Sequence, residues 1–248
     1  MYVRDTDGPT DAVLVLLHGG GVAGWMWDAQ VESFASDFRI LVPDLHGHDH
    51  SVHIPFTTSA AIVADLEERL EQLPAGRDVT VAGFSLGAQI ALSLACARPD
   101  LVTRLVVTSA LTSGLPLAAV SRCLVSLTAP LTRVEWFAKL QAKSLFIPDN
   151  LRADYLRTSS SLTRRSLVAL TTANAEFRTP PTWHTYPGDS LLLAGSEESR
   201  SLLRDMRRLH EDNPRSRLVI HDGAGHGLPL QHSDWFTTRV GDWIDSVR

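Results

Sequence analysis

The stretch VTVAGFSLGAQI, residues 79–90, decides the fold. Its first half, Val79 to Phe84, is a short continuous apolar run, which is typical of a strand buried on both faces. Its second half begins a run of apolar residues at helical spacing, which continues past the stretch and places Leu86, Ile90 and Leu94 on one side. A buried strand that turns directly into a helix predicts an α/β protein with a mostly parallel sheet.

The same alternation of apolar runs and helix-period stretches extends in both directions along the chain. The final helix is predicted to open at Ser233 as its N-cap residue. Right-handed crossovers make all the strands parallel and place helices on both faces, as in a three-layer sandwich. Six runs are predicted as strands: Ala12 to Leu17, Arg39 to Pro43, Val79 to Phe84, Leu101 to Thr108, Ser190 to Ala194 and Arg217 to His221.

The alternation is interrupted between the fourth and fifth predicted strands. Residues 112–185 contain no strand-like run, and they are too long for one loop in a compact domain. We predict a helical cap, or lid, inserted into a core domain made of residues 1–111 and 186–248. The helix-permissive stretches of this insertion are Leu117 to Leu127, Val134 to Leu145 and Leu162 to Ala173.

The composition is that of a globular protein, with 248 residues, 44% hydrophobic and 21% charged. These values exclude disordered and collagen-like chains. The net charge of −5 argues against nucleic acid as a partner. The longest early apolar run, Ala12 to Leu17, is too short for a signal segment or a membrane span, so we expect a cytoplasmic protein without a membrane partner. Cys96 and Cys123 are expected to be free thiols of an intracellular protein.

Ser85 lies at the centre of the motif Gly83-Phe84-Ser85-Leu86-Gly87, which fits the pattern G-x-S-x-G. On a tight strand-to-helix turn, small residues on either side let the backbone fold back, and the hydroxyl projects above the sheet. The start of the helix offers N–H groups to developing negative charge. Ser85 is therefore the candidate nucleophile. For the pattern taken by itself, a turn that only reverses the chain is the alternative.

A serine needs a base to take its proton, and His226 is the candidate. It lies in the glycine-rich segment Gly223 to Gly227, between the last predicted strand and the last helix. Such a loop can reach the carboxyl edge of the sheet, where Ser85 is also expected. A solvated loop histidine is the alternative, but the order of serine before histidine favours the catalytic role.

The histidine must itself be oriented by an acid that comes between the serine and the histidine in the chain. Glu198 stands three residues after Gly195, at the end of the fifth predicted strand, where a carboxylate can turn back toward His226. Glu197 is the adjacent alternative, and the other interpretation of Glu197 is a solvated charge that opens the next helix. We assign Glu198 as the acid.

The segment His18-Gly19-Gly20-Gly21 directly follows the first predicted strand. Consecutive glycines permit positive φ and expose N–H groups without obstruction by side chains. We predict that the backbone N–H groups of Gly20 and Leu86 form an oxyanion hole. A phosphate-binding loop is the rival interpretation, but the segment has no G-K-S or G-K-T ending.

In their order, these features resemble the α/β-hydrolase fold family. The segment His18 to Trp27 is also similar to the equivalent loop of the hydroxynitrile lyase and methylesterase branch. The resemblance implies a small ester or acyl substrate in an occluded pocket, a Ser85–His226–Glu198 triad and a lid formed by residues 112–185. It is carried by His18 to Gly21, Pro43 to His48, the Ser85 turn, Gly195 to Glu198 and Gly225-His226.

The chain also departs from the pattern of that family. Aspartate is commoner than glutamate at the position of Glu198, although the orienting role tolerates one more methylene. About eleven residues precede the first predicted strand, so the usual leading antiparallel hairpin must be short or absent. The nucleophile is a serine, so the chemistry of aspartate-dependent dehalogenases and epoxide hydrolases is not expected.

Other residues suggest weaker roles. Trp25 follows the oxyanion loop and is the best placed of the aromatic residues to line a substrate pocket. Four histidines, His46, His48, His50 and His53, crowd one loop, but a zinc site usually draws ligands from more than one element. We therefore predict neither a metal nor another cofactor.

The sequence thus predicts a carboxylesterase-like serine hydrolase that cleaves a small-molecule ester or thioester through an acyl-enzyme. One alternative uses the same triad for lyase or carbon–carbon bond chemistry. Hydroxynitrile lyases need an additional lysine, and the chain has only Lys139 and Lys143, both in the predicted lid. The other alternative is a non-catalytic ligand-binding member of the fold. The sequence predicts no oligomeric state.

Overall fold

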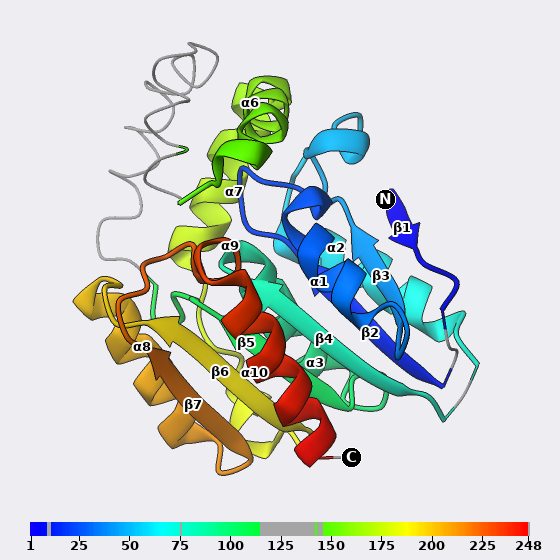
Figure 1. Ribbon diagram of the computed structural model, residues 1–248, viewed down its shortest axis with the longest axis vertical. Helices are drawn as coiled ribbons and strands as arrows, with labels where there is room; N and C mark the ends of the chain where they lie inside the picture. The colour runs from blue at the N-terminus through cyan, green and yellow to red at the C-terminus, as the bar shows by residue number, and fades with distance from the viewer. Residues whose placement is uncertain (9–10, 75, 115–141, 143–145, 248) are drawn as a thin grey trace.

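The computed structural model describes residues 1–248 except 9–10, 75, 115–141, 143–145 and 248 (Figure 1). Its described strands form one sheet in the order β1-β3-β2-β4-β5-β6-β7. All neighbouring strands are parallel except β1, which is antiparallel to β3. The strands are β1 (Val3–Asp5), β2 (Ala12–Leu17), β3 (Arg39–Pro43), β4 (Asp78–Phe84), β5 (Arg104–Thr108), β6 (Asp189–Gly195) and β7 (Ser216–His221).

The six predicted strands are confirmed, with two corrections. Strand β5 begins at Arg104 rather than at Leu101, because the N–H groups of Leu101 and Val102 donate to Arg98 and close the turn after the preceding helix. The six predicted strands are parallel to one another and the sheet is mostly parallel, as expected, but a seventh strand, the antiparallel β1, was not predicted. This strand is only three residues long, and its partner β3 lies far along the chain, so no local pattern announces it.

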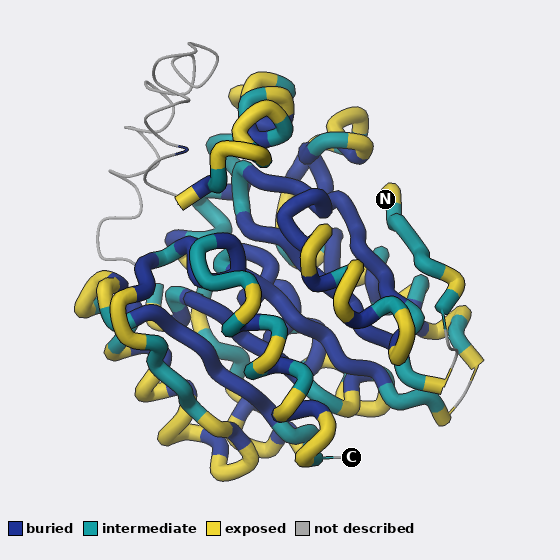
Figure 2. Tube along the Cα trace, in the orientation of Figure 1, coloured by how far each residue is buried: buried dark blue, intermediate teal, exposed yellow. Residues whose placement is uncertain are grey.

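Helices cover both faces of the sheet (Figure 1). On one face lie α1 (Asp28–Phe34) and α10 (Ser233–Ser246), and on the other lie α2 (Ser59–Glu71), α3 (Leu86–Ala97) and α8 (Arg200–Asp212). Alternate residues of the central strands belong to the two opposite cores, which explains the continuous apolar runs. Figure 2 shows these strands buried along nearly their whole length.

The start of the last helix differs from the prediction. The N-cap residue of α10 is His232, and Ser233 is the first helical residue. The hydroxyl of Ser233 accepts a hydrogen bond from Gln30 Nε2 at 3.0 Å, so it ties α10 to α1 instead of capping its own helix.

The described part of residues 112–185 is helical. It comprises η4 (Asp149–Leu151), α6 (Arg152–Ser161), α7 (Arg164–Glu176) and η5 (Pro181–Thr185), with one isolated bridge between Ser113 and Arg178. Helix α7 covers most of the predicted stretch Leu162 to Ala173. The stretch Leu117 to Leu127, and Val134 to Leu145 apart from Ala142, lie outside the described residues. In Figure 1, α6 and α7 stand at the end of the sheet toward which the parallel strands point.

Candidate active site

Ser85 occupies a strained turn between β4 and α3. Its φ is 53°, in the left-handed region that residues other than glycine rarely adopt. The flanking glycines allow this turn, because a Cβ atom at Gly83 would overlap the backbone of Gly87, and one at Gly87 would overlap the carbonyl of Leu17. The spacing G-x-S-x-G thus has a steric cause, and it leaves the Ser85 hydroxyl at the carboxyl edge of the sheet.

The structure brings the three predicted triad side chains into one hydrogen-bonded line. His226 Nε2 lies 3.2 Å from Ser85 Oγ, and His226 Nδ1 lies 3.1 Å from Glu198 Oε2. A proton on Nδ1 that is donated to Glu198 leaves Nε2 free to accept the serine proton. The imidazole is 33% exposed while the Glu198 side chain is 3% exposed, so a nearly buried carboxylate is hydrogen-bonded to a ring that solvent can reach.

Of the two neighbouring glutamates, the structure brings only Glu198 to the histidine. The Glu197 residue is exposed, and its backbone N–H donates to the carbonyl of Ala224 at 2.9 Å. This hydrogen bond joins the loop that follows β6 to the loop that carries His226. Glu197 therefore contributes backbone geometry to the site, whereas Glu198 contributes its carboxylate.

Ser196 strengthens the same junction, and the sequence analysis did not single it out. Its N–H donates to the carbonyl of His221 at 2.8 Å, and its hydroxyl donates to Asp222 Oδ1 at 3.1 Å. The hydroxyl oxygen also accepts the N–H of Gly223 at 2.9 Å. The acid loop and the histidine loop are consequently held as one unit beside Ser85.

The two residues predicted to supply the oxyanion donors, Gly20 and Leu86, are in contact, since the Gly20 backbone packs against the Leu86 side chain. A Cβ atom at Gly20 would be 3.7 Å from Leu86 Cδ2 and 3.2 Å from Leu170 Cδ1, so the glycine backbone lies between α3 and α7. Leu86 is the first residue of α3, and such a residue has an N–H without an intrahelical acceptor. Both N–H groups therefore belong to the edge of the site where Ser85 lies.

The glycines of this loop also have the spacing of a dinucleotide-binding motif, since Gly19, Gly21 and Gly24 match G-x-G-x-x-G. In the structure, the Gly24 N–H donates to Asp44 Oδ1 at 2.8 Å and the Gly21 N–H donates to His48 Nε2 at 3.1 Å. Two of the N–H groups that a phosphate would need are thus used by side chains of the protein. The Asp44 carboxylate, which follows β3 and contacts this loop, also disfavours a bound anion.

An aromatic side chain fills the space between the histidine and the glycine loop. The ring of Phe84 lies 5.2 Å from the ring of His226, and a Cβ atom at Gly19 would meet the Phe84 ring at 2.9 Å. In the sequence, Phe84 was predicted only as part of the buried strand. Its position next to Ser85 in the chain is the signal that could have identified it.

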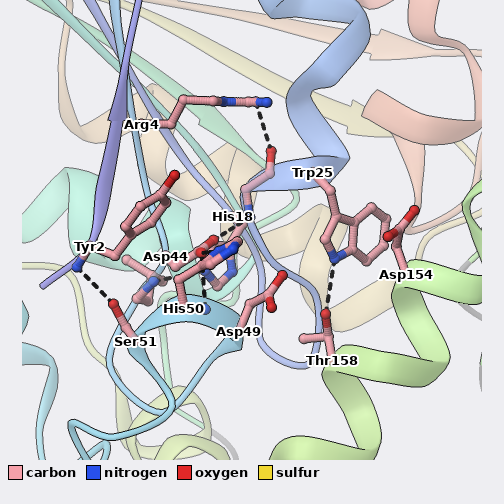
Figure 3. A network of polar contacts seen from close by, with 12 residues as sticks. Tyr2, Arg4, His18, Trp25, Asp44, Asp49, His50, Ser51, Asp154 and Thr158 are labelled. Atoms are coloured by element: carbon pink, nitrogen blue, oxygen red, sulfur yellow. Dashed lines mark hydrogen bonds and ion pairs between the residues drawn. The ribbon is translucent and has the colours of Figure 1, made fainter.

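Trp25 lies in η1 (Gly24–Trp27), next to the predicted cap. Its indole N–H donates to Thr158 Oγ1 of α6 at 3.0 Å in a buried contact (Figure 3). Trp25 and Leu230 help to line a cavity of about 380 Å³, whose described lining residues lie outside the three triad loops. Contact of Trp25 with a substrate therefore stays a prediction, while its contact with α6 is observed.

Histidines of the histidine-rich loop contact different partners instead of converging on one point. His46 pairs with Asp65 at 2.8 Å. His50 pairs with Asp44 at 2.7 Å (Figure 3). Among the described residues, the one group close enough together to hold a metal ion is Asp44, Asp49 and His50. Asp44 already accepts hydrogen bonds from Gly24 and His50, and Asp49 pairs with Arg157. These residues are thus engaged with one another and with neighbouring elements.

Several remaining predictions concern residues away from the triad. Cys96 is a free thiol, and burial raises its pKa to about 11, which makes a reactive thiolate unfavourable. Cys123, Lys139 and Lys143 lie outside the described residues. Within the part of the chain that the structure describes, no helix combines the length and apolar character needed to cross a membrane.

Comparison with known proteins gives a consistent result. A model of the alpha/beta hydrolase family matches residues 14–239. A pimeloyl-[acyl-carrier protein] methyl ester esterase from Nitrosomonas europaea is 26% identical, and the alignment covers 91% of this chain and 92% of that protein. An esterase of the same name from Vibrio atlanticus is 38% identical, but this alignment covers only 38% of this chain and 34% of that protein.

Solved structures share the fold at low sequence identity. An esterase from Exiguobacterium antarcticum superimposes with a TM-score of 0.85 at 20% identity, covering 98% of this chain and 95% of that chain. A thermophilic esterase from Thermogutta terrifontis gives a TM-score of 0.82 at 23% identity, with coverage of 99% and 93%. At these identities the likeness shows the fold alone.

Proposed function

The chain belongs to the alpha/beta hydrolase family, and we propose that it is a serine hydrolase that cleaves a carboxylic ester or thioester of a small molecule. The observation that carries this proposal is the hydrogen-bonded line from Ser85 through His226 to Glu198. The names of the relatives support the ester-cleaving class, since the matched curated proteins include methyl ester esterases.

The reaction follows from the direction of these hydrogen bonds. His226 Nε2 takes the proton of Ser85 as Oγ attacks the substrate carbonyl carbon, and the carbonyl oxygen becomes an oxyanion. The tetrahedral species then expels the alkoxide or thiolate, which receives that proton from His226. A water molecule, deprotonated in turn by His226, attacks the acyl carbon and forms a second tetrahedral species. When this species collapses, the bond to Ser85 Oγ breaks, the serine oxygen takes the proton back from His226, and the acid is released.

Two further contributions stabilise charge during this reaction. The N–H groups of Gly20 and Leu86 hold the oxyanion, and each such donor is worth on the order of 10² to 10³ in rate. Glu198 stabilises the imidazolium that forms when His226 takes the proton. Because its side chain is nearly buried, the attraction between the two charges is screened less than it would be in water.

We also propose that residues 112–185 act as a cap over this site. Helix α7 supports this role through Leu170, which packs against the backbone of Gly20. Helix α6 supports it through Thr158, which accepts the indole proton of Trp25. A cap that touches the oxyanion loop would limit the size of the acyl or alcohol group, so we expect small substrates in a largely enclosed pocket.

The proposal is tested by replacing the nucleophile. Ser85→Ala should abolish turnover of short p-nitrophenyl esters, because within the described residues Ser85 Oγ is the hydroxyl that lies within hydrogen-bond reach of His226 Nε2. Ser93→Ala is the matched control, since Ser93 lies on the same helix and bonds only the carbonyl of Gln89 in the described structure. Full activity of Ser85→Ala would refute the proposed chemistry. A wild-type protein that turns over no ester, thioester or lactone would instead indicate a ligand-binding member of the fold.

A further inference from the structure

Two buried histidines lie behind the oxyanion loop, and the proposed chemistry does not use them. His18 and His48 have no exposed surface, and their rings meet edge to face with centroids 4.9 Å apart. Burial lowers the pKa of His18 to about 4 and that of His48 to about 3. Both rings are therefore neutral at ordinary pH, and each has one donor and one acceptor nitrogen.

The contacts of His48 determine which nitrogen carries its proton. Nδ1 lies 2.9 Å from the carbonyl oxygen of His46, which can only accept, so Nδ1 carries the hydrogen. Nε2 is left as an acceptor, and it receives the N–H of Gly21 at 3.1 Å. One directional hydrogen bond thus fixes the His48 ring within the loop after β3, and the other joins it to the glycine loop after β2.

These bonds act on the peptide units that flank Gly20. Gly21 has a φ of 83°. In an unrestrained loop a glycine would adopt many other backbone conformations as well. On the other side of Gly20, His18 Nδ1 lies 2.7 Å from the carbonyl oxygen of Gly19. Because a peptide unit is planar and trans, fixing the Gly19 carbonyl makes the Gly20 N–H point the opposite way. The two imidazoles thus hold both ends of the segment that carries the predicted oxyanion donor.

We propose that His48 is a positioning residue of the oxyanion hole, which holds the Gly21 N–H so that the backbone of Gly20 stays beside Leu86. This inference rests on the proposed function, because it assigns a role to His48 only if the Gly20 N–H receives an oxyanion. His48 acts through Gly21 and touches no reacting atom. Its effect should therefore fall on the charged tetrahedral species and spare the binding of the neutral substrate.

The test compares two variants of His48. His48→Phe keeps a buried ring but removes the acceptor, whereas His48→Gln keeps an amide oxygen that can receive the Gly21 N–H. With p-nitrophenyl acetate, His48→Phe should lower kcat about 10-fold or more, short of the ~10² to 10³ that a whole oxyanion donor is worth. KM should change less than about 3-fold, and His48→Gln should recover most of the lost rate.

A trifluoromethyl ketone provides a readout that a general loss of structure would not give. This inhibitor adds the serine oxygen and forms an anion like that of the tetrahedral species, so its Ki should weaken in His48→Phe by about the same factor as kcat falls. An unchanged kcat in folded His48→Phe, a loss confined to KM, or an unchanged Ki would each overturn the proposal. Ser85→Ala is measured in parallel, because retained activity there refutes the proposed function itself.

A measurement on the wild-type protein covers the case in which His48→Phe does not fold. Nitrogen NMR of the imidazoles should show His48 neutral, with its proton on Nδ1, throughout the pH range in which the enzyme is active. A proton on Nε2 would remove the acceptor for Gly21 and would overturn the proposal.

Discussion

The two sides of Ser85 use histidine in opposite ways. On the side of Glu198, His226 is one-third exposed and its partner is a carboxylate, as the proposed proton transfer requires. On the oxyanion side, His48 is fully buried and its partners are backbone groups, an arrangement that keeps the ring neutral. The difference teaches that proton transfer and the holding of a loop make opposite demands on the same side chain.

The first way to break this comparison is to remove the charge that supports His226. Glu198→Gln keeps the shape of the side chain but cannot stabilise the imidazolium, so kcat should fall by up to about 10⁴. Glu197→Gln is the matched control, because its backbone contact with Ala224 survives the change. Rates measured with one p-nitrophenyl ester decide the matter, and a larger loss in Glu197→Gln would transfer the role of acid to that residue.

The hydrogen bonds that join the Glu198 loop to the His226 loop can be weakened without changing a triad residue. Ser196→Ala removes the hydrogen bonds that its hydroxyl makes to Asp222 and Gly223, each worth about 1 kcal/mol. We expect kcat to fall about 10-fold, because His226 and Glu198 then spend less time aligned. Ser36→Ala, an exposed serine far along the chain, should leave kcat unchanged. Equal rates for the two variants would mean that Ser196 does not position the loops.

The neutral histidines of the oxyanion side should make folding sensitive to acid. Burial holds the pKa of His18 near 4 and that of His48 near 3, below the ordinary 6.5. Between pH 6.5 and the lowered pKa of each ring, the two histidines bind protons in the unfolded chain but not in the folded chain. The free energy of unfolding therefore falls as the pH drops from 6.5 toward 4. Each group contributes about 1.4 kcal/mol per pH unit in that window.

Urea unfolding at several pH values measures this effect. His48→Gln removes one of the two groups, so its free energy of unfolding should fall less steeply with acid than that of the wild type. The same slope in both proteins would contradict the neutral, buried state of His48.

The smallest effect is expected where the oxyanion side meets the predicted cap. Trp25→Phe removes the hydrogen bond to Thr158 but keeps an aromatic ring, and it should cost about 0.5–1.5 kcal/mol of stability. Thr158→Val removes the same bond from the other side, so the double variant should cost little more than either single one. If thermal unfolding shows that the stability losses of the two single variants add up in the double variant, the two side chains do not stabilise the protein through a shared hydrogen bond.

Local spacing explains why the Ser85 turn could be predicted. Gly83 and Gly87 are required by contacts within a few residues and with the adjacent strand, so the motif is visible in the sequence. The six longer strands are likewise visible, because burial on both faces demands continuous apolar runs. Glu198 could be favoured over Glu197 because only its distance from the strand end lets the carboxylate turn back.

Other features depend on partners that are far apart in the chain. Helix α6 is rich in serine and other polar residues, so it shows little apolar periodicity, and its contact with Trp25 spans 133 residues. The bond between His48 and Gly21 joins two loops whose approach is set by the sheet order. Sequence patterns showed the histidines of that loop and argued against a metal site, but they did not identify the hydrogen-bond partner of each ring.

Labelling with a fluorophosphonate probe tests the central claim most directly, because the probe reacts only with a serine that a neighbouring base has activated. The account predicts one adduct, found by peptide mass mapping on Ser85, and a labelling rate that collapses in His226→Gln. An adduct on another residue, or equal rates of labelling in the two proteins, would contradict it.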